Sequence, residues 1–388
     1  MNLLTTSSFE ERNQILAETV EAFSNRADKH DLEGSFPFEN FNDLRAINYH
    51  ALTVPKKYGG LGISLYEMVR HQETIAMADG STALSIGWHM GITKHLGENQ
   101  VWQEEKYRAF AKEVIENGAL LNNAATEPAT GSPTRGGRPE TVAKKTQEGW
   151  VINGRKSFTT MAPILDYFVV SASIDGTDQV GNFLIKRSRE GVKVEETWDS
   201  IAMKATGSHD LVLENVHVAE DDLVEKITPG NKPAAGWLLH IPACYLGIAQ
   251  AAKKQALEFA TTYSPSSIKG TIADLPTVKQ RIGEMELRIM ESKYFLYAVA
   301  KQWDEGSEEE RQKMKPELGA VKLSVVNKAL EVVDLAMRIV GARSLSQKNP
   351  LQRYYRDVRA GLHNPPMDDM TIMLLASSAI EQLKNASN

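Results

Sequence analysis

Two short stretches of the chain carry hydroxyl, aromatic and small side chains at spacings that suit a flat ring. The first, Thr126–Ser132, reads Thr-Glu-Pro-Ala-Thr-Gly-Ser and predicts a polar turn with hydroxyl and backbone N–H groups. The second, Asn153–Thr160, reads Asn-Gly-Arg-Lys-Ser-Phe-Thr-Thr and predicts a β-strand. Residues two apart in a strand point to the same face, so Phe158 and Thr160 would contact one ligand side by side. Together the two stretches indicate a seat for a planar heteroaromatic ring.

Each stretch alone also has an ordinary structural interpretation. A segment rich in Thr, Ser and Gly is usually a surface loop, and a phenylalanine at alternate spacing usually packs in a core. The hydroxyl of Thr160 would then bond only to neighbouring backbone. The order and the spacing of the two stretches favour the ring-binding interpretation.

The segments that must position these stretches predict three parts. Apolar residues recur at helical spacing in the first part, residues 1–118, and in the last part, residues 229–388, whereas residues 119–228 change to a period of two. The expected helices are Phe9–Phe23, Phe41–Tyr49, Leu65–Asp79, Ser81–Leu96, Glu104–Asn117, Ala234–Thr262, Leu275–Glu305, Glu308–Val340 and Pro366–Leu383, and the expected strands are Phe168–Ala172, Gly181–Ile185 and Leu211–Val218. The sequence predicts an α+β fold with a β-domain between two helical domains.

Composition limits the classes of protein that the chain can belong to. Its 388 residues carry 44 basic and 50 acidic side chains, a formal net charge of −6, which argues against a general binder of nucleic acid or of anionic membranes. The single cysteine, Cys244, excludes an internal disulfide and a cysteine-based metal cluster, and its apolar surroundings indicate a buried thiol. No basic-then-apolar leader and no membrane-length apolar run is present, so we expect a cytoplasmic protein.

Three further segments accompany the two stretches in a fixed order. They are Val54–Gly62, Thr206–Ser208 running into Leu211–Val218, and Tyr355–Asp357. Taken together, the five segments resemble the acyl-CoA dehydrogenase family over almost the whole chain. The resemblance implies an N-terminal all-α domain, a middle β-sheet or barrel domain and a C-terminal four-helix bundle. It also implies FAD, in preference to FMN, and a homotetramer or homodimer packed through the C-terminal bundle.

The resemblance also implies roles for single residues. Thr160 would hydrogen-bond the hydride-accepting nitrogen of the flavin, and Phe158 takes the place of the usual tryptophan. The other residues placed at the cofactor are Ala125, Thr126, Gly131, Ser132, Thr159 and Gly341. The implied reaction removes a proton beside a thioester carbonyl while a hydride passes to the flavin, with an electron-transfer flavoprotein as the partner.

The sequence departs from the family at the catalytic base. Pro365 stands where most members carry a glutamate, and Trp237 stands at the alternative position of that glutamate. We consider three replacement groups: Asp368, next to Asp369, and the histidines His363 and His89. Each also has a structural alternative, because acids suit the first turn of a helix and a lone histidine is usually packed or exposed.

Two further losses concern the cofactor. Tyr263–Ser266 replaces the family's Arg-x-x-Phe-Gly segment, which usually reaches the diphosphate of the cofactor from a neighbouring subunit, and the family's paired glycines have become Gly341 and Ala342. These losses put standard dehydrogenation in question but leave flavin binding as an expectation.

Three functions therefore stay open, with FAD-linked dehydrogenation of an acyl-CoA thioester favoured. The second is a two-component flavin-dependent monooxygenase of the same fold, since Leu362–Pro365 resembles the Leu-His-Asp-Pro turn of that group, and its partner would be a flavin reductase. The third is a non-catalytic protein that binds flavin or an acyl thioester. The Thr-Glu-Pro form of the first stretch favours the dehydrogenase.

Overall fold

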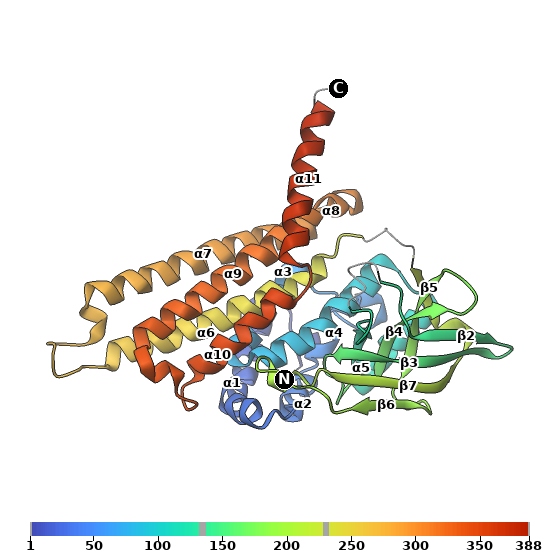
Figure 1. Cartoon of the computed structure of the whole chain (residues 1–388), viewed down its shortest axis with the longest axis horizontal. Helices are drawn as coiled ribbons and strands as arrows, with labels where there is room; N and C mark the ends of the chain where they lie inside the picture. Colours follow the sequence, from blue (N-terminus) through green and yellow to red (C-terminus); the bar gives the residue numbers. More distant parts are fainter. Residues whose placement is uncertain (1, 132–136, 228–232, 387–388) are drawn as a thin grey trace.

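Three structural parts follow one another along the chain in the computed structural model, which describes residues 2–131, 137–227 and 233–386 (Figure 1). The first part is helical, with α1 (Phe9–Glu33), α2 (Phe38–Ala46), α3 (Leu65–Ala78), α4 (Gly80–Asn99) and α5 (Glu104–Asn117). This order confirms the predicted α+β architecture of a sheet domain between helical domains.

Local sequence explains where the first helices begin and end. The hydroxyl of Ser8 accepts a hydrogen bond from the backbone at the start of α1, Ser64 does the same for α3, and the carboxylate of Asp79 caps α4. Helices α1 and α5 end at Gly34 and Gly118, both in the left-handed conformation that glycine adopts without strain.

One mixed sheet forms the middle part. Its strands are β1 (Leu121–Ala124), β2 (Val142–Thr146), β3 (Gly149–Thr159), β4 (Tyr167–Ile174), β5 (Val180–Lys186), β6 (Val192–Glu195), β7 (His209–Val218) and β8 (Leu223–Ile227). The order across the sheet is β6-β7-β3-β2-β4-β5-β8, and β1 pairs in parallel with β4. Strand β4 is buried along its whole length, so the core of this domain lies around it.

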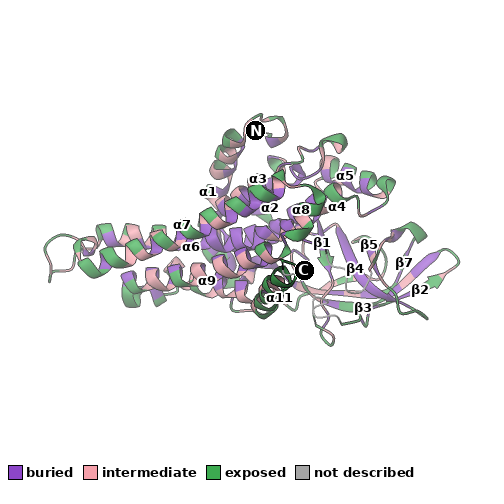
Figure 2. Ribbon diagram, turned by 90° about the horizontal axis from the view of Figure 1, so that it is seen from above, coloured by how far each residue is buried: buried purple, intermediate pink, exposed green. Residues whose placement is uncertain are grey.

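Long helices return in the third part. They are α6 (His240–Thr262), α7 (Pro276–Glu305), α8 (Glu308–Lys313), α9 (Lys315–Val340), α10 (Pro350–Ala360) and α11 (Asp368–Ala386). Helix α6 is buried among α3, α7 and α9, at the centre of the purple region in Figure 2. One continuous core therefore runs through both helical domains and into the sheet, and a second cluster lies where α4 and α5 meet β1 and β4.

The structure corrects one expectation in this part and confirms another. Glu308–Val340 is not one helix, because α9 begins afresh at Lys315; Pro316 lacks a backbone N–H and fits only a first helical turn. The last predicted helix does form, as α11, but it projects from the bundle with most of its residues exposed (Figures 1 and 2). Thr371 is the one residue of α11 that the structure buries.

Two smaller expectations concern apolar segments. Cys244 is a free and fully buried thiol on α6, as predicted. Among the described residues, none of the helices combines the length and the apolar character needed to cross a bilayer.

Candidate functional site

A buried ion pair joins the two stretches that the sequence singles out. The Glu127 carboxylate lies 2.6 Å from the Lys156 ammonium, and both side chains are almost fully buried. The same carboxylate accepts hydrogen bonds from the backbone of Glu140 and from the backbone and hydroxyl of Thr141. Burial alone would raise the pKa of Glu127, but these donors lower it to about 2. Glu127 therefore fixes the turn that contains it to β3, through Lys156.

The turn itself is closed by backbone bonds. Glu127 and Gly131 exchange both of their backbone hydrogen bonds, at 3.2 and 2.9 Å, and the hydroxyl of Thr130 donates to the Glu127 carboxylate. Gly131 has a φ of 69°, which a residue with a side chain rarely adopts. Thr126 and Ala125 precede the turn and are half-buried, and the carbonyl of Thr126 accepts from the backbone N–H of Ser157. Ser132 lies outside the described residues.

The geometry around Phe158 corrects the simple strand argument. Phe158 has a φ of 57°, and the pairing of β3 with β7 shifts register between Lys156 and Thr159. Strand β3 ends at Thr159, so Thr160 lies in the turn that follows. The two-residue alternation is therefore broken at Phe158, and a shared face with Thr160 does not follow from strand geometry. That both groups contact one ligand stays a prediction.

Phe158 nevertheless presents an aromatic surface. It is 63% exposed, and the ring of Trp198 meets it edge-on, with ring centres 6.0 Å apart and an interplanar angle of 83°. Exposed aromatic rings of this kind are ready contact surfaces for a planar ligand. Trp198 was not among the predicted residues, because it is distant in the sequence and belongs to none of the five motifs.

Thr160 forms hydrogen bonds with Ser208, just before β7, and with Asn122 on β1. Its hydroxyl lies 3.0 Å from the Ser208 hydroxyl, which in turn lies 2.8 Å from the hydroxyl of Thr206. The amide of Asn122 on β1 donates to the backbone carbonyl of Thr160 at 2.9 Å. Thr206 and Ser208 belong to a motif that the sequence did mark, but only their position beside Thr160 makes them part of the site.

Two buried hydroxyls flank Phe158 without a partner. Thr159 Oγ1 and Ser157 Oγ are enclosed, and neither forms a hydrogen bond within the part of the chain that the structure describes. A buried hydroxyl without a partner costs free energy, about 1–3 kcal/mol. Because both hydroxyls are enclosed, the part of this segment that a planar ligand can reach is the exposed ring of Phe158.

The structure gives His89 a bonding pattern that favours a structural role. Its Nδ1 accepts from the backbone N–H of Leu121 at 3.1 Å, and its Nε2 lies 3.0 Å from the backbone oxygen of His50. Burial lowers the pKa of His89 to about 3, which keeps the ring neutral. His89 thus attaches α4 to β1, one residue before the Asn122 that holds Thr160.

The other two candidate bases lie around one turn. His363 is exposed at the end of a short 3-10 helix, Gly361–His363, while Asp368 begins α11. The Lys322 ammonium lies 3.0 Å from the Asp368 carboxylate, and Lys322 is almost fully buried on α9. Asp368 therefore compensates a buried charge, which ties it to the bundle.

Neither of the family's two base positions carries an acid in the structure. Pro365 is half-buried in the turn after His363, and the Tyr245 hydroxyl fixes the start of that turn by donating to Asn364 at 2.5 Å. Trp237 lies stacked on the ring of His240, with an interplanar angle of 6°. Of the residues predicted for the cofactor, Thr126 lies next to the Phe158–Thr160 segment, because its carbonyl accepts from the backbone N–H of Ser157. Gly341 is exposed and follows the last residue of α9 in the C-terminal domain.

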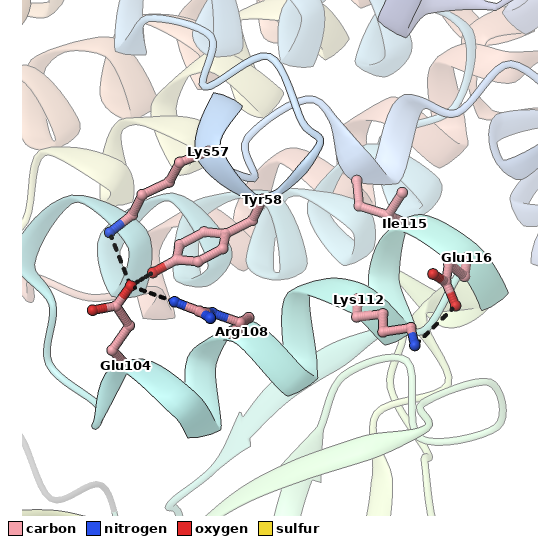
Figure 3. A pocket seen from close by; sticks show the side chains of 7 residues that line it. All are labelled: Lys57, Tyr58, Glu104, Arg108, Lys112, Ile115 and Glu116. Atoms are coloured by element: carbon pink, nitrogen blue, oxygen red, sulfur yellow. Dashed lines mark hydrogen bonds and ion pairs between the residues drawn. The ribbon is translucent and has the colours of Figure 1, made fainter.

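Two surface hollows lie away from the stretches around Thr126 and Phe158, although Val54–Gly62 lines the first in part and Leu211–Val218 the second. One, of about 510 Å³, is lined by Lys57, Tyr58, Glu104, Arg108, Lys112, Ile115 and Glu116 (Figure 3). Its charges are all paired, since Glu104 pairs with Arg108 and with Lys57, and Lys112 pairs with Glu116. The other lies beside Trp150 and His217. Neither is lined by a residue that the sequence predicts for the site.

Family models match three segments of the chain. They describe the N-terminal domain of acyl-CoA dehydrogenase over residues 10–99, the middle domain over residues 122–216 and the C-terminal domain over residues 239–364. The two stretches around Thr126 and Phe158 fall within the middle-domain match.

Individual relatives differ in the activity that their names state. A protein of Bacillus subtilis (strain 168), "Putative acyl-CoA dehydrogenase YdbM", is 52% identical over 367 residues, 94% of this chain and 96% of that one. An L-evernosamine nitrososynthase of a Micromonospora species is 28% identical, over 89% of this chain and 84% of its own length. The X-ray structure of KijD3 with FMN and an amino-sugar nucleotide has a TM-score of 0.85 and 25% identity, and covers 97% of this chain and 95% of that one.

Proposed function

This chain belongs to the acyl-CoA dehydrogenase family, and we propose that it is a flavin-dependent monooxygenase. In this proposal a separate reductase supplies reduced flavin, and one atom of O₂ enters an organic substrate. The support is the combination of a flavin seat with the ion pair that engages Asp368, the acid nearest to Pro365; the next acid, Asp369, is exposed.

The residues at the two stretches fit a flavin. Phe158 and Trp198 supply aromatic surface, and the Thr160 hydroxyl supplies a hydrogen-bonding group. Thr160 would contact the reactive edge, and Ala125, Thr126 and Gly131 the other end of the ring. When bound and reduced, flavin supplies the two electrons that activate O₂. FMN and FAD both suit this part of the site, since these residues would meet only the ring system.

The observation that carries the choice of reaction is the pairing of Asp368 with Lys322. Dehydrogenation needs a carboxylate that takes a proton from carbon. Asp368, the nearest acid after Pro365, instead bonds to a buried ammonium at 3.0 Å and to the Asn327 amide at 3.3 Å. Releasing it would leave Lys322 charged and buried without compensation, which is costly.

His363 is the residue that we assign to proton transfer in the monooxygenase. Its turn is anchored at one side by the Tyr245–Asn364 hydrogen bond and at the other by the Lys322–Asp368 pair, while its own side chain is exposed. An imidazole is a frequent proton donor and acceptor in catalysis, and the anchored turn fixes the position of this one. His363 would thus help to protonate the second atom of O₂, the one that does not enter the substrate and leaves as water.

A specific observation favours a second candidate, FAD-linked dehydrogenation of an acyl-CoA thioester. The 52% identical relative carries an acyl-CoA dehydrogenase name, and its match covers nearly the whole of both chains. In that case Asp368 would leave Lys322 and act as the base, and Gly341 would lie near the far end of the cofactor. An electron-transfer flavoprotein would then be the partner.

We also propose that the protein assembles as a homodimer or homotetramer through α11. A helix that stands alone in water gains little stability from its backbone, and α11 exposes the apolar side chains of Ile372, Met373 and Ile380. A second copy of the chain would cover these side chains.

Incorporation of labelled oxygen tests the proposed function. The protein is mixed with a flavin reductase, NADH, FMN and ¹⁸O₂, and with a panel of aromatic, amine and sulfur compounds. The monooxygenase predicts one ¹⁸O atom in a product, and His363→Ala should lower its yield strongly while flavin binding is kept. Absence of label from every product, with peroxide as the sole fate of O₂, would count against the proposal.

A further inference from the structure

The backbone of Met203 forms hydrogen bonds both to residues beside the seat and to a C-terminal helix. Its carbonyl accepts three hydrogen bonds: from Trp198 Nε1 at 3.2 Å, from the backbone N–H of Thr206 at 3.1 Å and from the Thr206 hydroxyl at 2.9 Å. Met203 is buried and has a φ of 52°, a conformation that side-chain-bearing residues rarely adopt. Such conformations persist only where surrounding contacts enforce them.

Residues on both sides of the seat are connected by hydrogen bonds to the carbonyl of Met203. On one side, Trp198 donates to Met203 and meets the exposed ring of Phe158 edge-on. On the other side, the hydroxyls of Thr206, Ser208 and Thr160 follow one another at 2.8 and 3.0 Å. The position of Met203 therefore affects the aromatic wall and the hydroxyl of the seat together.

Asp357 on α10, in the C-terminal domain, binds the backbone of Met203. The Asp357 carboxylate accepts from the backbone N–H of Met203 at 2.6 Å, and Asp357 is only 2% exposed. The neighbouring residue, Arg356, donates to the carbonyl of Ile201 at 2.6 Å and pairs with Asp31 on α1. Residues 201–203 are thus clamped from α10 at two successive positions.

A buried carboxylate is expensive to keep. Burial raises the pKa of Asp357 to about 7, although Arg353 and the Met203 N–H lower it in part. An amide or an apolar side chain would fill the same place at a smaller solvation cost. An apolar side chain could not accept the hydrogen bond that the backbone N–H of Met203, in the sheet domain, donates to the Asp357 carboxylate.

From this geometry we infer that Asp357 is a positioning residue for the flavin seat, acting through Met203 on Trp198 and on the Thr206–Ser208–Thr160 hydroxyls. The inference rests on the proposed flavin binding at Phe158 and Thr160. It adds Trp198 to the seat and makes the seat depend on the contact between the sheet domain and α10. Asp357 itself touches no reacting atom.

Flavin affinity and the fluorescence of Trp198 test this inference. The Trp198 signal is the difference in emission between each protein and the same protein carrying Trp198→Phe. We expect bound FMN to quench the Trp198 signal of the wild type, and Asp357→Ala to raise the Kd for FMN about tenfold. Asp357→Asn keeps an oxygen that accepts from Met203 N–H, so it should recover most of the affinity.

A matched control separates positioning from general loss of stability. Glu73 is a buried acid on α3 whose partners lie in the bundle: Gln250 on α6, and Lys293 and Tyr297 on α7. Glu73→Ala should lower the melting temperature at least as much as Asp357→Ala and leave the Kd for FMN within about twofold. Equal Kd values in Asp357→Ala and wild type, or a Kd that follows melting temperature in both variants, would overturn the inference.

The flavin-free protein distinguishes this inference from the proposed function. In it, Asp357→Ala should shift the Trp198 emission toward that of a more exposed indole, and Glu73→Ala should not. A wild type that binds neither FMN nor FAD would contradict the proposed function, whereas an unchanged Trp198 emission in Asp357→Ala would contradict the link through Met203.

Discussion

The carboxylate of Glu127 and the ammonium of Lys156 lie 2.6 Å apart, out of contact with solvent, and so fasten the first sequence motif to the second. Glu127→Gln would leave Lys156 as a buried charge without its partner. We expect a loss of about 3–5 kcal/mol in the free energy of unfolding. Urea denaturation followed by circular dichroism measures it.

The double variant Glu127→Gln with Lys156→Met is the control for that prediction. Removing both charges together avoids the unpaired ammonium, so the double variant should be clearly more stable than Glu127→Gln alone. Additive losses in the double variant would show that the pair is not coupled as the structure indicates.

The same pair gives a stability that depends on pH. The pKa of Glu127 is about 2 in the folded protein, below the ordinary value of 4.5. A lowered pKa of an acid stabilises the fold fully above the unfolded value, and this contribution is lost as the pH falls toward the folded value. The difference in unfolding free energy between wild type and Glu127→Gln should shrink from about pH 6 to pH 3. A difference that stays constant over this range would contradict the assignment.

The seat predicts the effect of truncating its ring. Phe158→Ala removes an aromatic contact worth about 0.5–1.5 kcal/mol beyond its area, so the Kd for FMN should rise about three- to tenfold. Thr160→Val should weaken binding by a similar factor, since it removes one hydrogen bond. Fluorescence titration of the flavin measures both. Tyr294→Ala, which truncates an exposed ring on α7, is the control and should bind like the wild type.

Helix α11 predicts the assembly state. Ile372→Asp combined with Met373→Asp places charges on its exposed apolar surface and should convert an oligomer into monomers. Light scattering after size-exclusion chromatography measures the mass. Ser377→Asp, on an exposed polar position of the same helix, should leave the mass unchanged. Monomeric wild-type protein would refute the proposed role of α11.

Much of the fold could be predicted because its signals are local. The apolar spacing of α3 and α4 and the change to a period of two before β4 are visible within short windows of sequence. The restart of α9 was also visible in principle, since Pro316 suits only a first turn. Helix α10 was missed, because it is short and rich in polar residues.

The site was harder to predict, because its decisive contacts are long-range. Nothing near Phe158 in the sequence announces its left-handed backbone or the register shift beside it. Asp368 and Lys322 lie on different helices. Asp357 lies on α10, whereas its partner Met203 lies in a loop of the sheet domain. Pairings of this kind depend on tertiary packing, so the motifs predict a seat but not the contacts that support it.

Anaerobic mixing with acyl-CoA thioesters tests the central claim most directly. The flavin-loaded protein is mixed without oxygen with thioesters of short, long, branched and aryl acyl chains, and flavin absorbance is followed. A monooxygenase whose Asp368 is bound to Lys322 predicts that the oxidised flavin keeps its colour with every thioester. Rapid bleaching by any of them, abolished in Asp368→Asn, would contradict the account and establish the dehydrogenase instead.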